Sequence, residues 1–205
     1  HGYFMSILDR YDEAVRSGKG AEFNLLLGHK AWGAAGRVRI YKELVRQGML
    51  SKIEQAKFRQ IFRQSMALSY DYPNLERSVN NRPYGMNGGP AVALKVFPDM
   101  PELKTHRRWL DALWRELTEY GDTTETNYYP YGPLLLQGWI DMAEGMDKFK
   151  TDRELLYALA KRYLDYVHGG GVRGNPNSGG RIKPGRDHIY LDPWNAEYFG
   201  GTEGV

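Results

Sequence analysis

Apolar residues recur at helical spacing in four long segments of the chain, about Ser51–Ser69, Glu102–Tyr120, Pro133–Met146 and Asp152–Val167. Large apolar side chains stand at positions i, i+3, i+4 and i+7, which places them on one face of a helix. These faces hold Phe58, Ile61, Phe62 and Met66; Leu103, Leu110, Leu113, Trp114 and Leu117; Leu135, Leu136, Trp139, Ile140 and Ala143; and Leu155, Leu156, Leu159, Tyr163 and Val167. The pattern predicts four helices, each with one buried face.

Two of these helices carry start signals. Ser51 and Glu54 stand at the spacing of a capping box, in which each side chain accepts a hydrogen bond from the other residue's backbone N–H. Asp152 stands where it can cap the last helix or lie in its first turn, where a negative charge is favoured by the helix dipole.

The rest of the first half is less regular. About Tyr3–Arg16, and Ala31–Gln47 after a break at Gly28, show a weaker helical pattern. Ala91–Phe97 fits either a strand or a helix; the preceding Pro90 suits the first turn of a helix, and Pro98 would end it. No segment alternates convincingly with period two, and short loops between long helices predict antiparallel hairpins. We therefore expect an all-α fold.

We expect two regions, a helical-hairpin region over residues 1–167 and an irregular region over residues 168–205. The second is rich in Gly, Pro and Asn but keeps Tyr190, Trp194, Tyr198 and Phe199. Disordered linkers lack such aromatic residues, so we expect an ordered segment that packs across helix ends or lines a site. The chain starts without Met and ends in a Gly-rich run, and we interpret it as part of a longer polypeptide that leads into a further domain.

Composition excludes several classes of protein. With 41% hydrophobic and 26% charged residues the chain is typical of a globular protein, and no stretch approaches the ~20 apolar residues of a membrane helix. The net charge of +3 is too small and dispersed to indicate nucleic-acid binding. The chain has no cysteine, which excludes a disulfide scaffold, a Cys nucleophile and a thiolate zinc site, and leaves the cellular compartment open. No phosphate-binding, zinc-protease, serine-hydrolase or calcium-loop motif occurs, so we expect no cofactor and no metal.

The first segment with candidate chemistry is Asn80–Gly89, and we expect Asn80–Asn87 to form a loop, as we do Glu125–Tyr131. It holds amide, guanidinium and phenol groups beside three glycines, which let a ligand approach the backbone closely. Arg82 could clamp a carboxylate through a two-pronged hydrogen bond, and Asn80 or Asn81 could donate to the same group. In the other interpretation the segment is a turn between helices, in which Asn and Gly only satisfy left-handed conformations and caps. The candidate residues here are Asn80, Asn81, Arg82, Tyr84 and Asn87.

The second candidate segment is Asp122–Pro133, which has three tyrosines within four residues just ahead of a helix. Tyrosine offers a flat face for sugar stacking, and its phenol can act as general acid or base when its pKa is lowered. Alternatively these rings pack the rim of the core while Thr126 or Asn127 caps the helix. The candidate residues here are Glu125, Asn127, Tyr128, Tyr129 and Tyr131.

The third candidate segment is Arg181–Asp192. His188 lies between Arg186 and Tyr190 in a polar loop, where its pKa could be near neutrality. A lone histidine is more often structural than catalytic, and this is how we interpret the histidines at helix starts, faces or ends, which are His29, His106 and His168. We take His188 as a catalytic candidate, with Arg186, Tyr190 and Trp194 as substrate contacts.

The first two segments, in this order on a helical-hairpin chain, resemble the α/α-toroid polysaccharide lyases, the group that contains alginate lyases and heparinase II/III-like enzymes. Asn80–Tyr84 is similar to the Asn-Asn-His stretch in which that group places its carboxylate-neutralising Asn. Glu125–Tyr131, followed by Leu134–Leu136 and Ala143–Glu144, is similar to its Tyr-bearing stretch that opens a core helix. Where the group often has His after the Asn pair, this chain has Arg82.

The resemblance implies a toroid or barrel of helical hairpins, of which this chain forms part or all, and β-elimination at a uronic acid. Asn81 and Arg82 would bind the carboxylate and stabilise enolate-like charge. Tyr129 or Tyr131 would transfer protons, with His188 as the alternative imidazole. The resemblance also implies an anionic polysaccharide or oligosaccharide substrate, no cofactor, and a secreted or periplasmic location.

Two other functions fit the same residues. An α/α-barrel glycoside hydrolase would use two carboxyl groups ~5–9.5 Å apart, taken from Asp122, Glu125 or Asp192. A non-catalytic helical scaffold would hold glycan on exposed Tyr and Trp rings with no perturbed ionisable group nearby.

Overall fold

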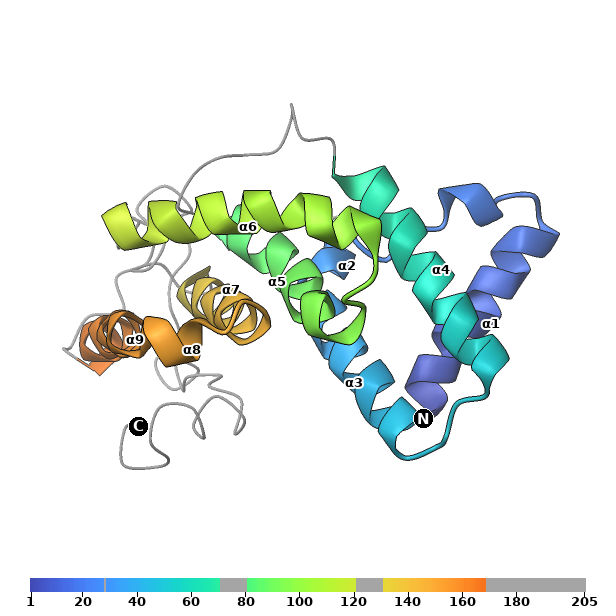
Figure 1. Ribbon diagram of the computed structural model, residues 1–205, viewed down its shortest axis with the longest axis horizontal. Coiled ribbons are helices and arrows are strands. Elements are labelled where there is room, and N and C mark those ends of the chain that lie inside the picture. The colour runs from blue at the N-terminus through green and yellow to red at the C-terminus, as the bar shows by residue number, and fades with distance from the viewer. Residues whose placement is uncertain (28, 71–80, 121–130, 169–205) are drawn as a thin grey trace.

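The computed structural model describes residues 1–27, 29–70, 81–120 and 131–168, and within these ranges every regular element is a helix (Figure 1). The elements are α1 (Gly2–Arg16), the 3-10 helix η1 (Gly20–Glu22), α2 (His29–Trp32), α3 (Ala34–Arg46), α4 (Lys52–Ser69), α5 (Asn81–Val96), α6 (Pro101–Tyr120), α7 (Tyr131–Gly145), α8 (Lys148–Thr151) and α9 (Arg153–His168). The prediction of an all-α fold is confirmed for the described ranges. Of the predicted irregular region, residues 169–205 lie outside them.

The four strongly patterned segments are helices, and their apolar faces are buried wherever the side chains are described, except for the half-buried Leu155. The predicted capping box at the start of α4 is confirmed. Ser51 Oγ accepts from the backbone N–H of Glu54 at 3.2 Å, and the Glu54 carboxylate accepts from the backbone N–H of Ser51 at 2.7 Å. The weaker segment Ala31–Gln47 is divided at Gly33 into α2 and α3.

Helices α3 and α5 lie side by side and run in the same direction. Near the start of α3, a Cβ atom on Gly89 would overlap the Cβ of Ala34. Further along α3, and just past the end of α5, the rings of Tyr41 and Phe97 have centroids 5.2 Å apart. Because the contacts advance along both segments together, the two helices are parallel.

Helix α7 packs against α5 in the same parallel sense. A Cβ atom on Gly138 would lie 2.6 Å from the backbone carbon of Tyr84, and one on Gly145 would overlap the carbonyl oxygen of Ala91. The two contacts have the same sequence separation, 54 residues, so α5 and α7 advance together in the same direction. Helices α3, α5 and α7 therefore form one parallel layer, which we call the inner layer.

A second layer covers one side of the inner layer. Helix α6 runs antiparallel to α5, because Tyr84 contacts Leu113 while Asn87, later in α5, contacts His106, earlier in α6. Figure 1 shows α6 passing across α5. The predicted antiparallel hairpin is confirmed for this pair.

Ion pairs and hydrogen bonds join the helices of this outer layer. Lys57 of α4 pairs with Asp12 of α1 at 2.6 Å. Two more pairs, Arg59 with Asp99 and Arg63 with Glu102, link α4 to the turn before α6 and to the first turn of α6. Trp114 Nε1 of α6 donates to Asp152 Oδ2, just before α9, at 2.6 Å. We call α1, α4, α6 and α9 the outer layer.

The buried apolar side chains form two clusters. One joins α1, α3 and α4 to the last turns of α5, and the other joins the first part of α5 to α6, α7 and α9. Leu94 is half-buried and packs against both clusters. Since α5 takes part in both clusters, it is the central helix of the described fold.

Asn80–Asn87 was expected to be a loop, and this prediction is wrong from Asn81 onward, where α5 begins. Glycine weakens an isolated helix, which is why the segment resembles a turn in sequence. Here glycine is needed for packing, because a Cβ atom on Gly88 would lie 2.7 Å from Asp141 Oδ2. Burial against neighbouring helices outweighs the low helix propensity.

Pro90 was expected in the first turn of a helix, but it lies inside α5. The ambiguous segment Ala91–Phe97 is helical as far as Val96, and Pro98 follows its end as expected. The position of Pro90 leaves one carbonyl of α5 without its usual donor, and a neighbouring helix supplies the replacement, as described below.

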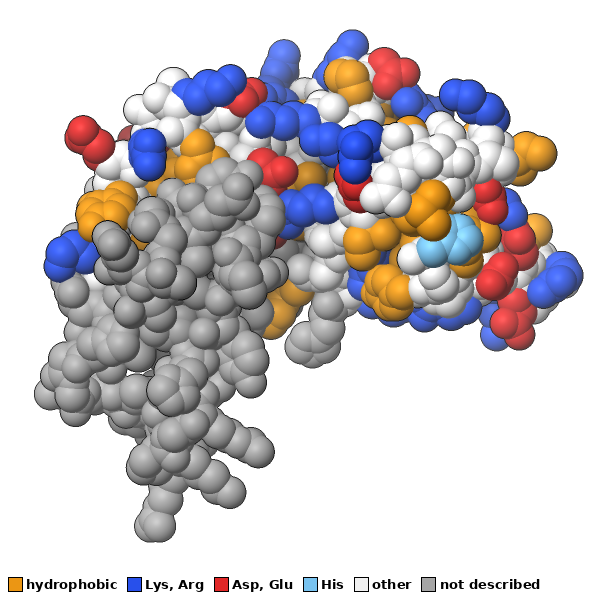
Figure 2. Space-filling model, turned by 90° about the horizontal axis from the view of Figure 1, so that it is seen from below, with side chains coloured by type: hydrophobic (Ala, Val, Ile, Leu, Met, Phe, Trp, Pro, Cys, Tyr) orange, Lys and Arg blue, Asp and Glu red, His pale blue; other side chains and the backbone are white. Residues whose placement is uncertain are grey.

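Charged side chains of both signs are interspersed over the described part of the face in Figure 2. This agrees with the dispersed charge expected from sequence. In the ranges that the structure describes, no helix combines the length and apolar character needed to cross a bilayer.

Candidate functional site

The parallel packing of α5 and α7 brings the described residues of two candidate segments, from Asn81 and from Tyr131 onward, to one end of the inner layer. The contact between Tyr84 and Gly138 lies three residues into α5, which begins at Asn81, and seven residues into α7, which begins at Tyr131. Helix α7 therefore extends four residues further, about one turn. The backbones of Asn81 and Tyr131 belong to the same end of two adjacent helices.

Helix α2 adds a tryptophan near this end. A Cβ atom on Gly85 would lie 3.3 Å from Cδ1 and Nε1 of the Trp32 ring, so the half-buried indole lies directly against the first turns of α5. Trp32 was not among the site residues predicted from sequence. The only signal was a tryptophan between two glycines, Gly28 and Gly33, in a segment of weak helical pattern.

The start of the inner layer favours negative charge. The N-terminal end of a helix carries a partial positive charge and unpaired backbone N–H groups. No acidic residue occurs in the first turn of α5 or α7, the two helices that share this end. A carboxylate at this end would be attracted by parallel helix dipoles, and no side chain in those turns would repel it.

Tyr84 and Asn87 were expected to contact substrate, but both side chains lie in the core. Tyr84 is fully buried and donates from its hydroxyl to the carbonyl of Leu113 at 2.8 Å. Burial raises its pKa further above the ordinary value, so the phenol stays protonated. Asn87 is 2% exposed. Its amide nitrogen donates to the carbonyl of Pro83, and its amide oxygen lies at hydrogen-bond distance from His106 Nε2. We therefore place neither residue in the candidate site.

His106 is also buried, which agrees with its interpretation as structural. Its Nε2 lies 2.6 Å from Asn87 Oδ1, and burial lowers the pKa of the imidazole to about 3. The ring is neutral at any physiological pH. The side chains of His29 and His168 lie outside those described.

The remaining predicted site residues are placed only in part. Asn81, Arg82 and Tyr131 begin helices, while their side chains lie outside those described. Outside the described residues altogether are Asn80, Glu125, Asn127, Tyr128, Tyr129, Arg186, His188, Tyr190 and Trp194.

A network of charges joins α3 to α7. Arg39 pairs with Asp141 at 2.6 Å and also with Glu144, and Gln137 donates to the same Asp141 oxygen at 2.8 Å. Burial raises the pKa of Asp141, while its bonds to Arg39 and Gln137 act in the opposite direction. Both carboxylates are engaged by one guanidinium. No pattern in the sequence indicates this network, because its residues lie about a hundred positions apart and match no motif.

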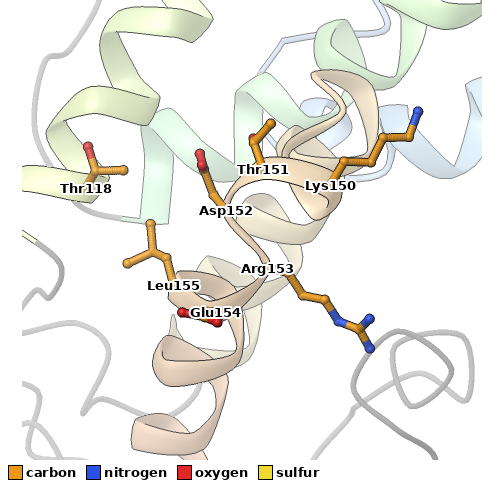
Figure 3. Close-up of a pocket in the computed structure, with 7 residues that line it drawn as sticks. All are labelled: Thr118, Lys150, Thr151, Asp152, Arg153, Glu154 and Leu155. Carbon is orange, nitrogen blue, oxygen red and sulfur yellow. The ribbon is translucent and has the colours of Figure 1, made fainter.

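A cavity of about 570 Å³ lies between α6 and the segment formed by α8 and the start of α9. Figure 3 shows Lys150 and Arg153 directed away from Thr118 on the opposite wall. Asp152 and Glu154 also line it, so its charges are mixed. The two cations do not converge as a carboxylate site requires.

A smaller cavity of about 160 Å³ lies between α4 and α6. Its lining includes Met66, Tyr70 and Glu102, and apolar surface predominates. Both cavities lie in grooves between neighbouring outer helices, rather than at the shared end of α5 and α7.

The chain matches no family model, no curated protein and no solved structure, so its function has to be inferred from its own residues and their arrangement.

Proposed function

We propose that this protein is a polysaccharide lyase that cleaves a uronic-acid-containing glycan by β-elimination. The observation that supports this most is the parallel packing of α5 and α7. It puts Asn81 and Arg82 at the same end of the inner layer as Tyr131. These are the segments in which the resemblance to the α/α-toroid lyases implies carboxylate binding and proton transfer.

In the proposed reaction, Asn81, Arg82 and the N-terminal ends of the inner helices bind the uronate carboxylate. Their positive charge stabilises the enolate-like state, which makes the C5 proton more acidic. Tyr129 or Tyr131, or else His188, removes this proton as general base. The C4–O bond then breaks, a C4=C5 double bond forms, and an acid from the same group of residues protonates the leaving oxygen.

Trp32 would contribute to substrate binding. Its indole lies against Gly85, next to the first turns of α5. An aromatic ring at that position offers a flat apolar face to a sugar ring while the carboxylate faces the helix ends. The proposed substrate is therefore an anionic polysaccharide or oligosaccharide, and such a substrate is consistent with a secreted or periplasmic enzyme.

We further propose that the described helices are part of an α/α toroid. Its inner helices would be α3, α5 and α7, which are parallel, and its outer helices would be α1, α4, α6 and α9. In such an arrangement successive inner helices start at the same end, so residues from several hairpins can serve one substrate.

A glycoside hydrolase is less well supported. Of the described carboxylates of the inner layer, Asp141 and Glu144 both bind Arg39, and Glu43 pairs with Arg46. All three are engaged by arginine, whereas hydrolysis needs a carboxylic acid that faces a second carboxyl group across the bond. A hydrolase would have to rely on Asp122, Glu125 or Asp192.

The test is to incubate the protein with a panel of uronate polysaccharides and to follow the ultraviolet absorbance of the unsaturated product. Elimination produces this absorbance together with new chain ends. New reducing ends without it would indicate hydrolysis, and binding without either signal would indicate a glycan-binding scaffold. Both of these outcomes contradict the proposal.

Two variants test the residue assignments. Arg82→Ala should reduce kcat/KM by about a hundredfold or more, as expected when a charge-stabilising donor is removed. Arg46→Ala is the matched control, because Arg46 is exposed at the opposite end of α3. Tyr129→Phe should abolish turnover and spare binding. Retained turnover would move the proton transfer to Tyr131 or His188.

A further inference from the structure

The central helix α5 contains a proline, and its missing hydrogen bond is replaced from another helix. Pro90 has no backbone N–H, so the carbonyl of Met86, four residues earlier, loses its usual donor. The hydroxyl of Tyr70 donates to this carbonyl at 2.9 Å. Tyr70 directly follows α4 and is 6% exposed, so the end of α4 supplies the bond that Pro90 cannot.

A second contact holds the preceding turn of α5. Asn87 Nδ2 donates to the carbonyl of Pro83 at 2.6 Å. This fixes Asn87 Oδ1 as an acceptor, and it faces His106 Nε2 at 2.6 Å. The imidazole therefore carries its proton on Nε2 and donates to Asn87.

The two contacts belong to one cluster. The rings of Tyr70 and His106 have centroids 4.3 Å apart and are tilted by 55°. The cluster joins the end of α4, the first half of α6 and residues 83–87 of α5. Residues 83–89 of α5 include glycine at positions 85, 88 and 89, so the helix propensity of this part is low and outside contacts decide its position.

We infer that Tyr70, Asn87 and His106 are positioning residues that hold the first turns of α5 in place, and with them Asn81 and Arg82. The inference rests on the proposed function in so far as it concerns catalysis. None of the three residues would touch the substrate, because all three side chains are buried within the layers. Their effect on the reaction would pass through the backbone of α5.

Hydrogen exchange tests the positioning without reference to activity. In Tyr70→Phe the amides of residues 84–89 should exchange about fivefold to tenfold faster, which corresponds to the loss of one hydrogen bond. Amides near the end of α5 should change less. Tyr41→Phe is the matched control, because Tyr41 is a similarly buried tyrosine in the aromatic cluster with Phe58 and Phe97. Equal exchange in the two variants would overturn the inference.

Kinetics test the link to catalysis. His106→Gln keeps an N–H donor toward Asn87, whereas His106→Leu removes it. We expect kcat to fall about tenfold in His106→Leu with a smaller change in KM, and to recover in His106→Gln. Equal activity of the two would contradict a positioning role.

Tyr70→Phe removes a single oxygen atom and should also lower kcat. Because this change is small, the variant provides the kinetic test if His106→Leu does not fold. Unchanged kcat in Tyr70→Phe would overturn the link to catalysis. If the wild-type protein has no lyase activity, the proposed function fails, and the exchange experiment still decides whether the cluster positions α5.

Discussion

His106 shows what burial does to a single ionisable side chain in this protein. Its ring is fully buried, its pKa is lowered to about 3, and its Nε2 donates to Asn87. In an unfolded chain the same imidazole would titrate at about 6.5. Between these two values the unfolded chain binds a proton at this position and the native protein does not.

The free energy of unfolding should therefore fall as the pH decreases below about 6.5. The contribution of His106 is about 1.4 kcal/mol per pH unit, because the unfolded state binds one more proton than the native state. Above about pH 6.5 the imidazole is neutral in both the folded and the unfolded state, so the contribution of His106 to the free energy of unfolding no longer changes with pH. Urea unfolding of the wild type and of His106→Gln at about pH 7, 6 and 5 measures it, since the carboxylates contribute equally to both proteins. Parallel pH profiles of the two proteins would contradict the buried, neutral imidazole.

At the scale of helices, the close packing of α5 against α7 depends on glycines at the contact, among them Gly138 and Gly145. Gly145→Ala should destabilise the protein by about 2–4 kcal/mol, because the new Cβ would overlap the carbonyl oxygen of Ala91 and backbone would have to move. Gly36→Ala is the control. Gly36 is exposed in α3 with nothing within 4 Å of an added Cβ, so alanine there should stabilise by about 0.5–1 kcal/mol.

Urea unfolding of both alanine variants measures this difference. Similar stabilities would mean that α5 and α7 do not pack backbone to backbone, and the shared end of the two helices would lose its basis. The same experiment therefore tests the geometry on which the proposed function depends.

The helices that sequence predicted best are those buried on one face. Helix α6 has a single stripe of leucines, and α4 has its capping box, so both signals survive in the linear pattern. Helix α5 is different, because α3, α6 and α7 all contact it and glycines make much of that contact. A helix covered on several sides shows no single apolar stripe, and its glycines resemble a turn.

For the candidate site, the sequence indicated which segments carry polar and aromatic side chains, but not which of these side chains are buried. Two polar segments were recognised, and the parallel packing of α5 and α7 places the backbones of their described residues, from Asn81 and from Tyr131 onward, at one end. Tyr84 and Asn87 were assigned to the substrate because their phenol and amide groups stand beside glycines that let a ligand approach the backbone closely. Their partners, Leu113 and His106, are 29 and 19 residues away on another helix. Nothing local in the sequence indicates such pairings.

At the scale of the whole molecule, Arg39 connects the first and last helices of the inner layer. Its guanidinium binds Asp141 and Glu144 of α7 from α3, and the Asp141 carboxylate lies against Gly88 of the intervening α5. Asp141 is 4% exposed, so it depends on Arg39 and Gln137 to compensate its charge. This network holds three parallel helices in register.

Arg39→Met should destabilise the protein by about 3–5 kcal/mol, because it leaves the buried carboxylate of Asp141 without its cation. Arg46→Met is the control, since Arg46 pairs with Glu43 on the surface of the same helix, and its midpoint in thermal unfolding should not change. The double variant Arg39→Met, Asp141→Leu should recover part of the loss, because neither charge then remains buried alone. Urea unfolding of the wild type, Arg39→Met, Asp141→Leu and the double variant completes a thermodynamic cycle. A loss in Arg39→Met no larger than in Arg46→Met would show that the inner layer is held together by apolar contacts alone.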